Sequence, residues 1–413
     1  MFWLWVTCFL ILSSIIQCNG LVSSRNWETK YITESLENSD AAMLEQTKFL
    51  SRFRNTRRNE DVSVAAKQIQ FNYKCNLITK NVDARCNDLS HKCVLLVQPI
   101  GVGIGRWYYD RLLQELVKSQ DILVDNISFI VPDLLGSGSA AKPSYILEDG
   151  CKETFSEDLP LLTVNDWTAQ LIELMKSYEI QLGEEYTNIE WMVVANGGCV
   201  PIALEVAKQF IEGLHKHKIV HLCLTAPPKV SSLIMKPPSN KKLAKSYRTL
   251  QGLAGKAFWW YSLRKNGKFI RSFSEKNLAS DPENLGEDWV PQCIQTAKSN
   301  DGYSKFSTFS FLAGSLQGGC KEKLDVLAGQ IPVSVIRGSD KRKNPARSYF
   351  WTRNRKSKHE IQNEEKSLSQ FLKENNNVGE ELFVGGRRCP AHEDANGFAK
   401  AMMSLLSLDT SKH

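Results

Sequence analysis

The apolar and polar positions of this chain follow two alternating patterns from about residue 93 onward. Short apolar runs with little polar alternation, such as CVLLVQP at 93–99 and IEWMVVA at 189–195, are typical of strands buried on both faces of a parallel sheet. Stretches with helical spacing of apolar residues separate these runs, as in VNDWTAQLIELMKSY at 164–178. The pattern therefore predicts an α/β fold in which helices cover both faces of a parallel sheet.

The alternation continues toward the C-terminus with one interruption. Further strands are predicted at 127–138, 220–228, 331–340 and 381–386, and further helices at 201–214 and 397–408. Residues 229–330 lack this rhythm and are rich in basic and aromatic side chains. We predict a core made of residues 71–228 and 331–413, with residues 229–330 inserted as a cap.

The first 70 residues differ from the rest of the chain. Residues 1–20 form an apolar run that ends in small and polar residues, which favours a signal peptide cleaved after Gly20 and entry into the secretory pathway. A membrane anchor needs about 20 consecutive apolar residues, and this run is shorter and interrupted by serine and glutamine. Residues 21–70 are polar with mixed charge, so we expect a partly disordered leader region.

Composition adds one local feature. The hydrophobic fraction of 42% and the charged fraction of 23% are ordinary for a folded globular protein, and the net charge is +7. Residues 341–358 hold eight lysines and arginines and no acid. This loop is either a solvated surface loop or a contact for an anionic membrane surface, and nucleic-acid binding is not expected because no recognised module accompanies the charge.

Metal and cofactor sites are not expected. None of the eleven cysteines has the paired spacing of a zinc or redox site, while Cys75, Cys86 and Cys93 either pair in an oxidising compartment or remain buried thiols. The glycines at 101, 103 and 105 miss the dinucleotide-binding fingerprint by one position. They predict a tight turn after the strand at 93–99.

Three turn motifs, in this order, resemble the α/β-hydrolase superfamily. LVQPIG at 96–101 lies where the family has a strand running into His-Gly, PDLLGSG at 132–138 is similar to the family's D-x-x-G-x-G turn, and GRRCPAHE at 386–393 is similar to the ending G-H-C-P-x-D-E of many plant members. IGVGIGRWYYDR at 100–111 resembles more closely a group from plants, algae and cyanobacteria. The resemblance covers 93–408 and implies an α/β-hydrolase fold, a mostly parallel doubly wound sheet with an inserted helical cap, and a plastid reached through the secretory route as an alternative location.

The resemblance also places a catalytic site in which the expected residues are replaced. The family's nucleophile sits on a strand-to-helix turn, G-x-S-x-G, and in MVVANGGCVPIAL at 192–204 this position is Gly197. Cys199 is the nearest nucleophile, and it is either a packed helix thiol or a displaced nucleophile. Arg388 stands at the histidine position, His392 lies four residues beyond it, and Asp340 lies one residue before the family's acid.

Two hypotheses follow, so whether the protein is an enzyme stays open at this point. In the first, backbone amides at Ile100 and Gly198, the turn at Gly197 and the charge of Arg388 bind a small apolar ligand with a carbonyl or carboxylate end, with little or no catalysis. In the second, Cys199, His392 and Asp340 hydrolyse an ester, thioester or lactone. In either case we expect Trp259 or Trp260 of the cap to face the site.

Overall fold

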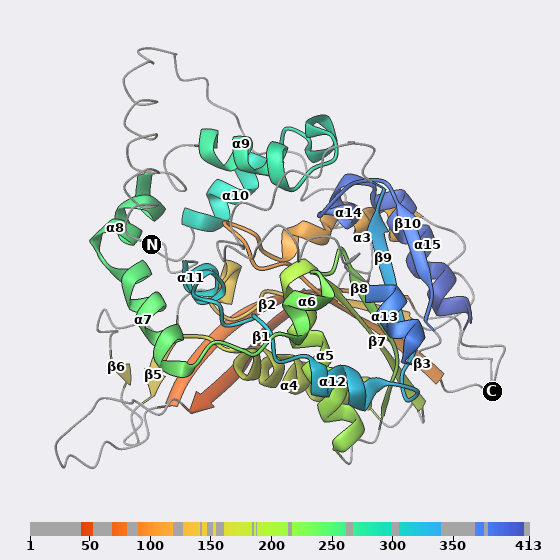
Figure 1. Ribbon diagram of the computed structural model, residues 1–413. Helices are drawn as coiled ribbons and strands as arrows, with labels where there is room; N and C mark the ends of the chain where they lie inside the picture. Colours follow the sequence, from red (N-terminus) through yellow and green to blue (C-terminus); the bar gives the residue numbers. More distant parts are fainter. Residues whose placement is uncertain are drawn as a thin grey trace. The chain divides into compact units, whose positions relative to one another are not determined.

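The structure is a computed structural model, and it divides into the units Met1–Ser39 and Asp40–His413. All described residues belong to the second unit (Figure 1), and they are 43–52, 68–80, 90–118, 127–140, 143–146, 152–153, 161–183, 186, 188–213, 217–261, 267–298, 305–339, 368–375 and 379–408. The predicted signal peptide at 1–20, Cys86, Asp340 and the basic loop at 341–358 lie outside the described residues.

Within the described residues, ten strands form one sheet in the order β10-β9-β8-β7-β3-β4-β2-β5-β6, with β1 paired to β2. Six of them run parallel: β3 (Ser90–Val97), β4 (Ile127–Pro132), β7 (Asn188–Asn196), β8 (Lys218–Thr225), β9 (Val333–Gly338) and β10 (Glu381–Val384). These six strands coincide within a few residues with the six predicted from apolar runs. The predicted α/β architecture is confirmed.

The central strand β3 shows why the runs lack polar alternation. Successive side chains of a strand point to opposite faces of the sheet. Leu95 and Val97 are buried in the hydrophobic cluster on one face, and Val94 and Leu96 in the cluster on the other. Both faces therefore need apolar residues at every position.

The remaining strands form the antiparallel side of the sheet: β1 (Met43–Arg52), β2 (Gln68–Lys80), β5 (Pro143–Ile146) and β6 (Lys152–Glu153). β2 pairs antiparallel with β1, β4 and β5. The predicted leader region at 21–70 contains one strand among its described residues, Met43–Arg52, and the first residues of β2. The ladder between β1 and β2 consists of backbone hydrogen bonds, which do not require an apolar side-chain pattern.

Helices cover both faces of the sheet. One cluster contains buried residues of α4 (Val164–Leu182), α5 (Val200–Glu212), α12 (Lys321–Leu327) and α13 (Leu368–Glu374). The other contains buried residues of α3 (Asp110–Lys118), α14 (Pro390–Glu393), α15 (Ala395–Leu408) and the short helix η1 (Arg106–Tyr109). A further short helix, η3 (Gly138–Ala140), follows β4. The sheet is therefore the middle layer of three.

The segment between β8 and β9 is helical. It contains α6 (Val230–Ile234), α7 (Asn240–Gln251), α8 (Leu253–Phe258), α9 (Gly267–Asn277), η7 (Pro282–Leu285), α10 (Trp289–Lys298) and α11 (Lys305–Ala313), green to cyan in Figure 1. The last helix of the predicted cap, α12, packs against α5 of the core. No helix among the described residues is both long enough and apolar enough to cross a membrane.

Two of the three cysteines proposed as disulfide partners are described, and both are free thiols. Cys75 and Cys93 are buried, at 2% and 0% exposure. Burial raises the pKa of the Cys75 thiol to about 12, because the thiolate loses its hydration inside the protein. These thiols are therefore protonated at neutral pH.

Candidate functional site

The turn after β7 has the shape that a nucleophile would need, with a glycine at its tip. Gly197–Cys199 form a short 3-10 helix, η5, and α5 starts at the next residue. Gly197 has φ 53°, a left-handed conformation that glycine adopts without steric cost. A Cβ built on Gly197 would have only the Ala226 carbonyl oxygen, at 4.0 Å, within reach. The turn thus has space for a side chain at position 197, although glycine has none.

Cys199 points into the core. It is fully buried, and its sulfur donates to the Gln98 carbonyl oxygen at 3.1 Å. Burial raises the pKa of the thiol to about 12, although a hydrogen bond from the Ile100 amide lowers it in part. Thiolate is the nucleophilic form of cysteine, so this thiol is unreactive in the observed conformation.

The same contact changes the expectation for the predicted anion site. The Ile100 amide lies close to the Cys199 sulfur and acts to lower the pKa of the thiol. Gly198, which supplies the second predicted amide, lies under the ring of Phe311 from α11. A Cβ at Gly198 would be 2.6 Å from the Phe311 Cε2 atom. The cap therefore packs directly on the turn.

His392 lies in an aromatic cluster. Its Nε2 atom donates to the Leu285 carbonyl oxygen at 3.0 Å, and its ring centre lies 4.7 Å from that of Trp289 and 6.0 Å from that of Trp107. Burial lowers the pKa of His392 to about 4, and the charge of Arg111 lowers it further. The imidazole is therefore neutral and hydrogen-bonded to the cap.

The proposed catalytic pair is consequently not brought together. The Cys199 sulfur and the His392 Nε2 atom each hydrogen-bond a different backbone carbonyl oxygen. The second hypothesis needs the histidine to take the proton of the thiol, and in this conformation no hydrogen bond between the two side chains provides for that transfer. Both side chains are buried, and each gives its hydrogen to a backbone carbonyl oxygen. The third member, Asp340, lies outside the described residues.

Carboxylates hold the turn after β10, where the family has its histidine. Glu393 accepts from the Arg387 amide at 2.8 Å, and Asp394 accepts from the Gly385 amide at 2.6 Å. The Arg388 amide donates to the Leu278 carbonyl oxygen at 3.0 Å, while the residue as a whole is exposed. Partial burial and the neighbouring Arg387 charge lower the pKa of Arg388. Arg388 thus places a cation at this turn but no base.

Sequence reasoning missed Phe311 as a site residue and expected a tryptophan instead. Trp259 is 3% exposed and packs edge-on against Phe309 at 5.7 Å, and Trp260 is 54% exposed. A usable signal was present, because KFSTFSFLA at 305–313 is apolar or small on almost every side, which is typical of a buried helix. Thr308 of the same helix donates to the Gly101 carbonyl oxygen at 2.9 Å.

Comparison with solved structures identifies the fold. No family model and no curated protein matches the sequence. The peroxisomal α/β-hydrolase of Saccharomyces cerevisiae superposes with a TM-score of 0.51 and 12% identity, covering 90% of this chain and 91% of that one. The juvenile hormone epoxide hydrolase of the silkworm Bombyx mori gives 0.50 and 14%, covering 83% and 78%. The chain has the α/β-hydrolase fold.

At these identities the likeness concerns the fold alone. In an α/β-hydrolase fold the nucleophile occupies a strained strand-to-helix turn, and the acid and the histidine follow it in chain order. β7 and α5 flank such a turn here, and the turns after β9 and β10 follow along the chain. Gly197 lies in the first of these turns, and Arg388 follows β10.

The buried histidine gives a pH prediction. The pKa of His392 is about 4 in the folded protein, below the 6.5 of a free histidine, so stability is fully present above pH 6.5 and is lost as the pH falls toward 4. His392→Gln keeps a donor for the Leu285 carbonyl but cannot titrate. We expect the stability advantage of the wild type over this variant to shrink by roughly 2 to 3 kcal/mol between pH 7 and pH 4.

Urea unfolding of both proteins at each pH measures this difference. Burial raises the pKa of Asp110 to about 7, so its contribution to stability changes with pH in the opposite direction. Because both proteins contain Asp110, this contribution drops out of the difference between them. A difference that stays constant across this pH range would mean that His392 titrates normally and is not buried in solution.

Proposed function

We propose that this α/β-hydrolase-fold protein binds a small ligand at the turn after β7 and has little or no hydrolytic activity. The observation that carries the proposal is Gly197 at the tip of the turn, with φ 53° and no side chain. A glycine has no group that attacks a carbonyl carbon. The retained turn geometry then serves binding, because backbone amides at such a turn stabilise a carbonyl or carboxylate oxygen.

The surroundings favour a ligand that is mainly apolar. The open position in front of Gly197 is bounded by the Ala226 carbonyl, and the neighbouring Gly198 is covered by the Phe311 ring. An apolar ligand body suits such a lining, while a polar end would meet the Gly198 amide. Arg388 is the candidate cation for a carboxylate end.

The competing function, hydrolysis by Cys199, His392 and Asp340, has less support. The Cys199 thiol has a pKa of about 12 and is protonated at neutral pH, and the His392 imidazole has a pKa of about 4, which makes it a weak base for the proton of the thiol. Both would have to leave buried hydrogen bonds before they could meet. Loss of esterase activity in Cys199→Ala would nevertheless favour this function.

The test combines binding and turnover in one set of proteins. We expect the wild type to bind octanoate in a calorimetric titration and to leave p-nitrophenyl butyrate intact. Gly197→Ser has space for the hydroxyl, yet we expect no turnover from it, because no base at position 388 accepts the proton. Activity is expected only after Arg388→His is added, together with an acid at position 341.

Three outcomes would contradict the proposal. Robust turnover by Gly197→Ser alone would mean that a working base is already in place. Turnover by the wild type that disappears in Cys199→Ala would establish the hydrolase instead. If the wild type binds no octanoate and hydrolyses no ester, the ligand class proposed here is wrong.

A further inference from the structure

A long stretch of the cap has positive charge without any acid. Residues 213–274 contain no aspartate or glutamate, and residues 229–271 hold eleven lysines and arginines. The charged surface of a folded domain usually mixes both signs. A single-sign surface creates a field that attracts polyanions, so this part of the cap is set apart from the rest of the chain.

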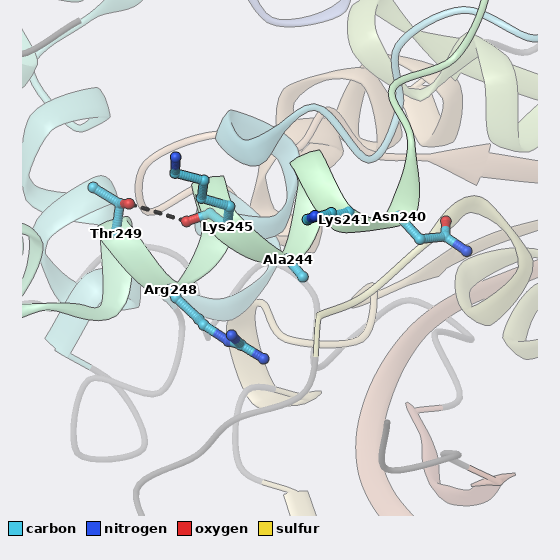
Figure 2. Close-up of a pocket in the computed structure, with 6 residues that line it drawn as sticks. All are labelled: Asn240, Lys241, Ala244, Lys245, Arg248 and Thr249. Atoms are coloured by element: carbon cyan, nitrogen blue, oxygen red, sulfur yellow. Dashed lines mark hydrogen bonds between the residues drawn. The ribbon is translucent and has the colours of Figure 1, made fainter. Parts of the chain in front are cut away.

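Helix α7 directs part of this charge outward. Leu243 and Tyr247 are buried, and α7 packs against α11. Lys241, Lys245 and Arg248, spaced to share one side of the helix, are exposed. They line an open hollow with Asn240, Ala244 and Thr249, and Figure 2 shows Lys245 and Arg248 extending away from the helix. In the part of the chain that the structure describes, no carboxylate pairs with these three cations.

Helix α8, which follows α7 and contacts it, carries large exposed apolar side chains. Leu253 is 88% exposed, and Trp260 and Tyr261 are 54% and 63% exposed on the turn that continues the helix. Positions 253, 257 and 260 share one side of a helix. Trp259 is buried against Phe309 and fixes the orientation of this segment. Leu253 and Trp260 therefore lie on one exposed side of this segment, and Tyr261 is exposed next to them.

We propose that α7 and α8 dock this protein on an anionic membrane surface. The docking face, called the cap ridge, consists of Lys241, Lys245, Arg248, Leu253, Trp260 and Tyr261. A helix with a basic side and Trp or Leu on the other lies in the plane of the interface, where Trp and Tyr rings sit at headgroup level. Anionic lipid provides the complementary charge, since each lysine or arginine near the surface strengthens binding several-fold.

The composition of the ridge favours a membrane over an acidic protein. The buried centres of protein–protein interfaces are depleted in charged residues, lysine above all. Lysine next to exposed leucine and tryptophan is instead typical of helices that lie on a bilayer. The ridge residues are separate in the sequence from the basic loop at 341–358.

Vesicle co-sedimentation of the full-length protein tests the proposal. We expect binding to phosphatidylcholine vesicles that contain phosphatidylserine, weak binding to phosphatidylcholine alone, and weaker binding at high salt. Replacing Lys241, Lys245 and Arg248 by glutamine is expected to lower the affinity by about 100-fold. Leu253→Ser with Trp260→Ser is expected to remove the binding that persists at high salt.

A matched control separates the ridge from net charge. Lys321, Lys373 and Lys400 are exposed on other helices, and replacing them by glutamine changes the total charge by the same amount. This control should bind like the wild type, and equal melting temperatures would show that all variants fold.

No binding to phosphatidylserine vesicles, or equal loss of binding in the control, would overturn the proposal. Binding to polyglutamate but not to vesicles, lost in the ridge variant, would assign the ridge to an acidic protein and would overturn it as well. Octanoate binding is expected to be unchanged in the ridge variants, so the two proposals fail independently.

Discussion

Gly103→Ala is expected to lower the free energy of unfolding by about 3 to 5 kcal/mol, among the largest effects of any single substitution in this chain. Gly103 lies in the turn after β3 and has φ 67°. A Cβ there would lie 2.0 Å from the Cys293 carbonyl oxygen of α10, so the turn and the cap would have to separate. The strain of a left-handed alanine adds to this overlap.

Gly329→Ala separates the two contributions. Gly329 also has a positive φ, 73°, but nothing lies within 4 Å of a Cβ placed on it. We expect a loss of about 1 kcal/mol, from backbone strain alone. Chemical unfolding of both variants measures the difference, and equal losses would mean that the cap does not approach the turn after β3 as described.

Trp289→Ala is expected to destabilise the protein by about 3 to 5 kcal/mol. Trp289 is 1% exposed, its Nε1 atom donates to Ser274 Oγ at 2.9 Å, and its ring packs against Trp107, Tyr108 and His392. Removing the ring leaves a large cavity between cap and core. It also leaves the Ser274 hydroxyl without this donor.

Two companion variants make this result interpretable. Trp289→Phe restores part of the ring volume and is expected to lose less stability than the alanine variant. Leu253→Ala removes a side chain that is 88% exposed and is expected to change stability by no more than about 0.5 kcal/mol. Thermal unfolding followed by near-ultraviolet circular dichroism reports all three, and a Trp289→Ala protein as stable as Leu253→Ala would contradict the described packing.

The central sheet was predictable because burial on both faces leaves a strong signal in the sequence. The run at 93–99 became β3, and the run at 189–195 became β7, with boundaries shifted by a few residues. The strands at the antiparallel side were missed. β6 has only two residues and β1 follows no apolar pattern, so their positions depend on backbone pairing with partners that the local sequence does not specify.

The candidate site was predictable only in part. The glycine at position 197 could be placed from the strand and helix that flank it. The hydrogen-bond partners of Cys199 and His392 could not be predicted. They are the backbone carbonyl oxygens of Gln98 and Leu285, and every residue has a carbonyl oxygen. Contacts of this kind depend on tertiary packing and leave no trace in residue identity.

The Phe311 ring lies against Gly198, so the residue type allowed at position 198 depends on the residue at position 311. A hydrolase turn grafted onto this chain would bring a side chain to position 198, and that side chain would occupy the same volume as the ring. Exchange at 198 therefore requires a smaller residue at 311, and exchange at 311 alone would open a void over the turn. Positions 198 and 311 must therefore be changed together, because a single substitution at either one gives a strained or poorly packed protein.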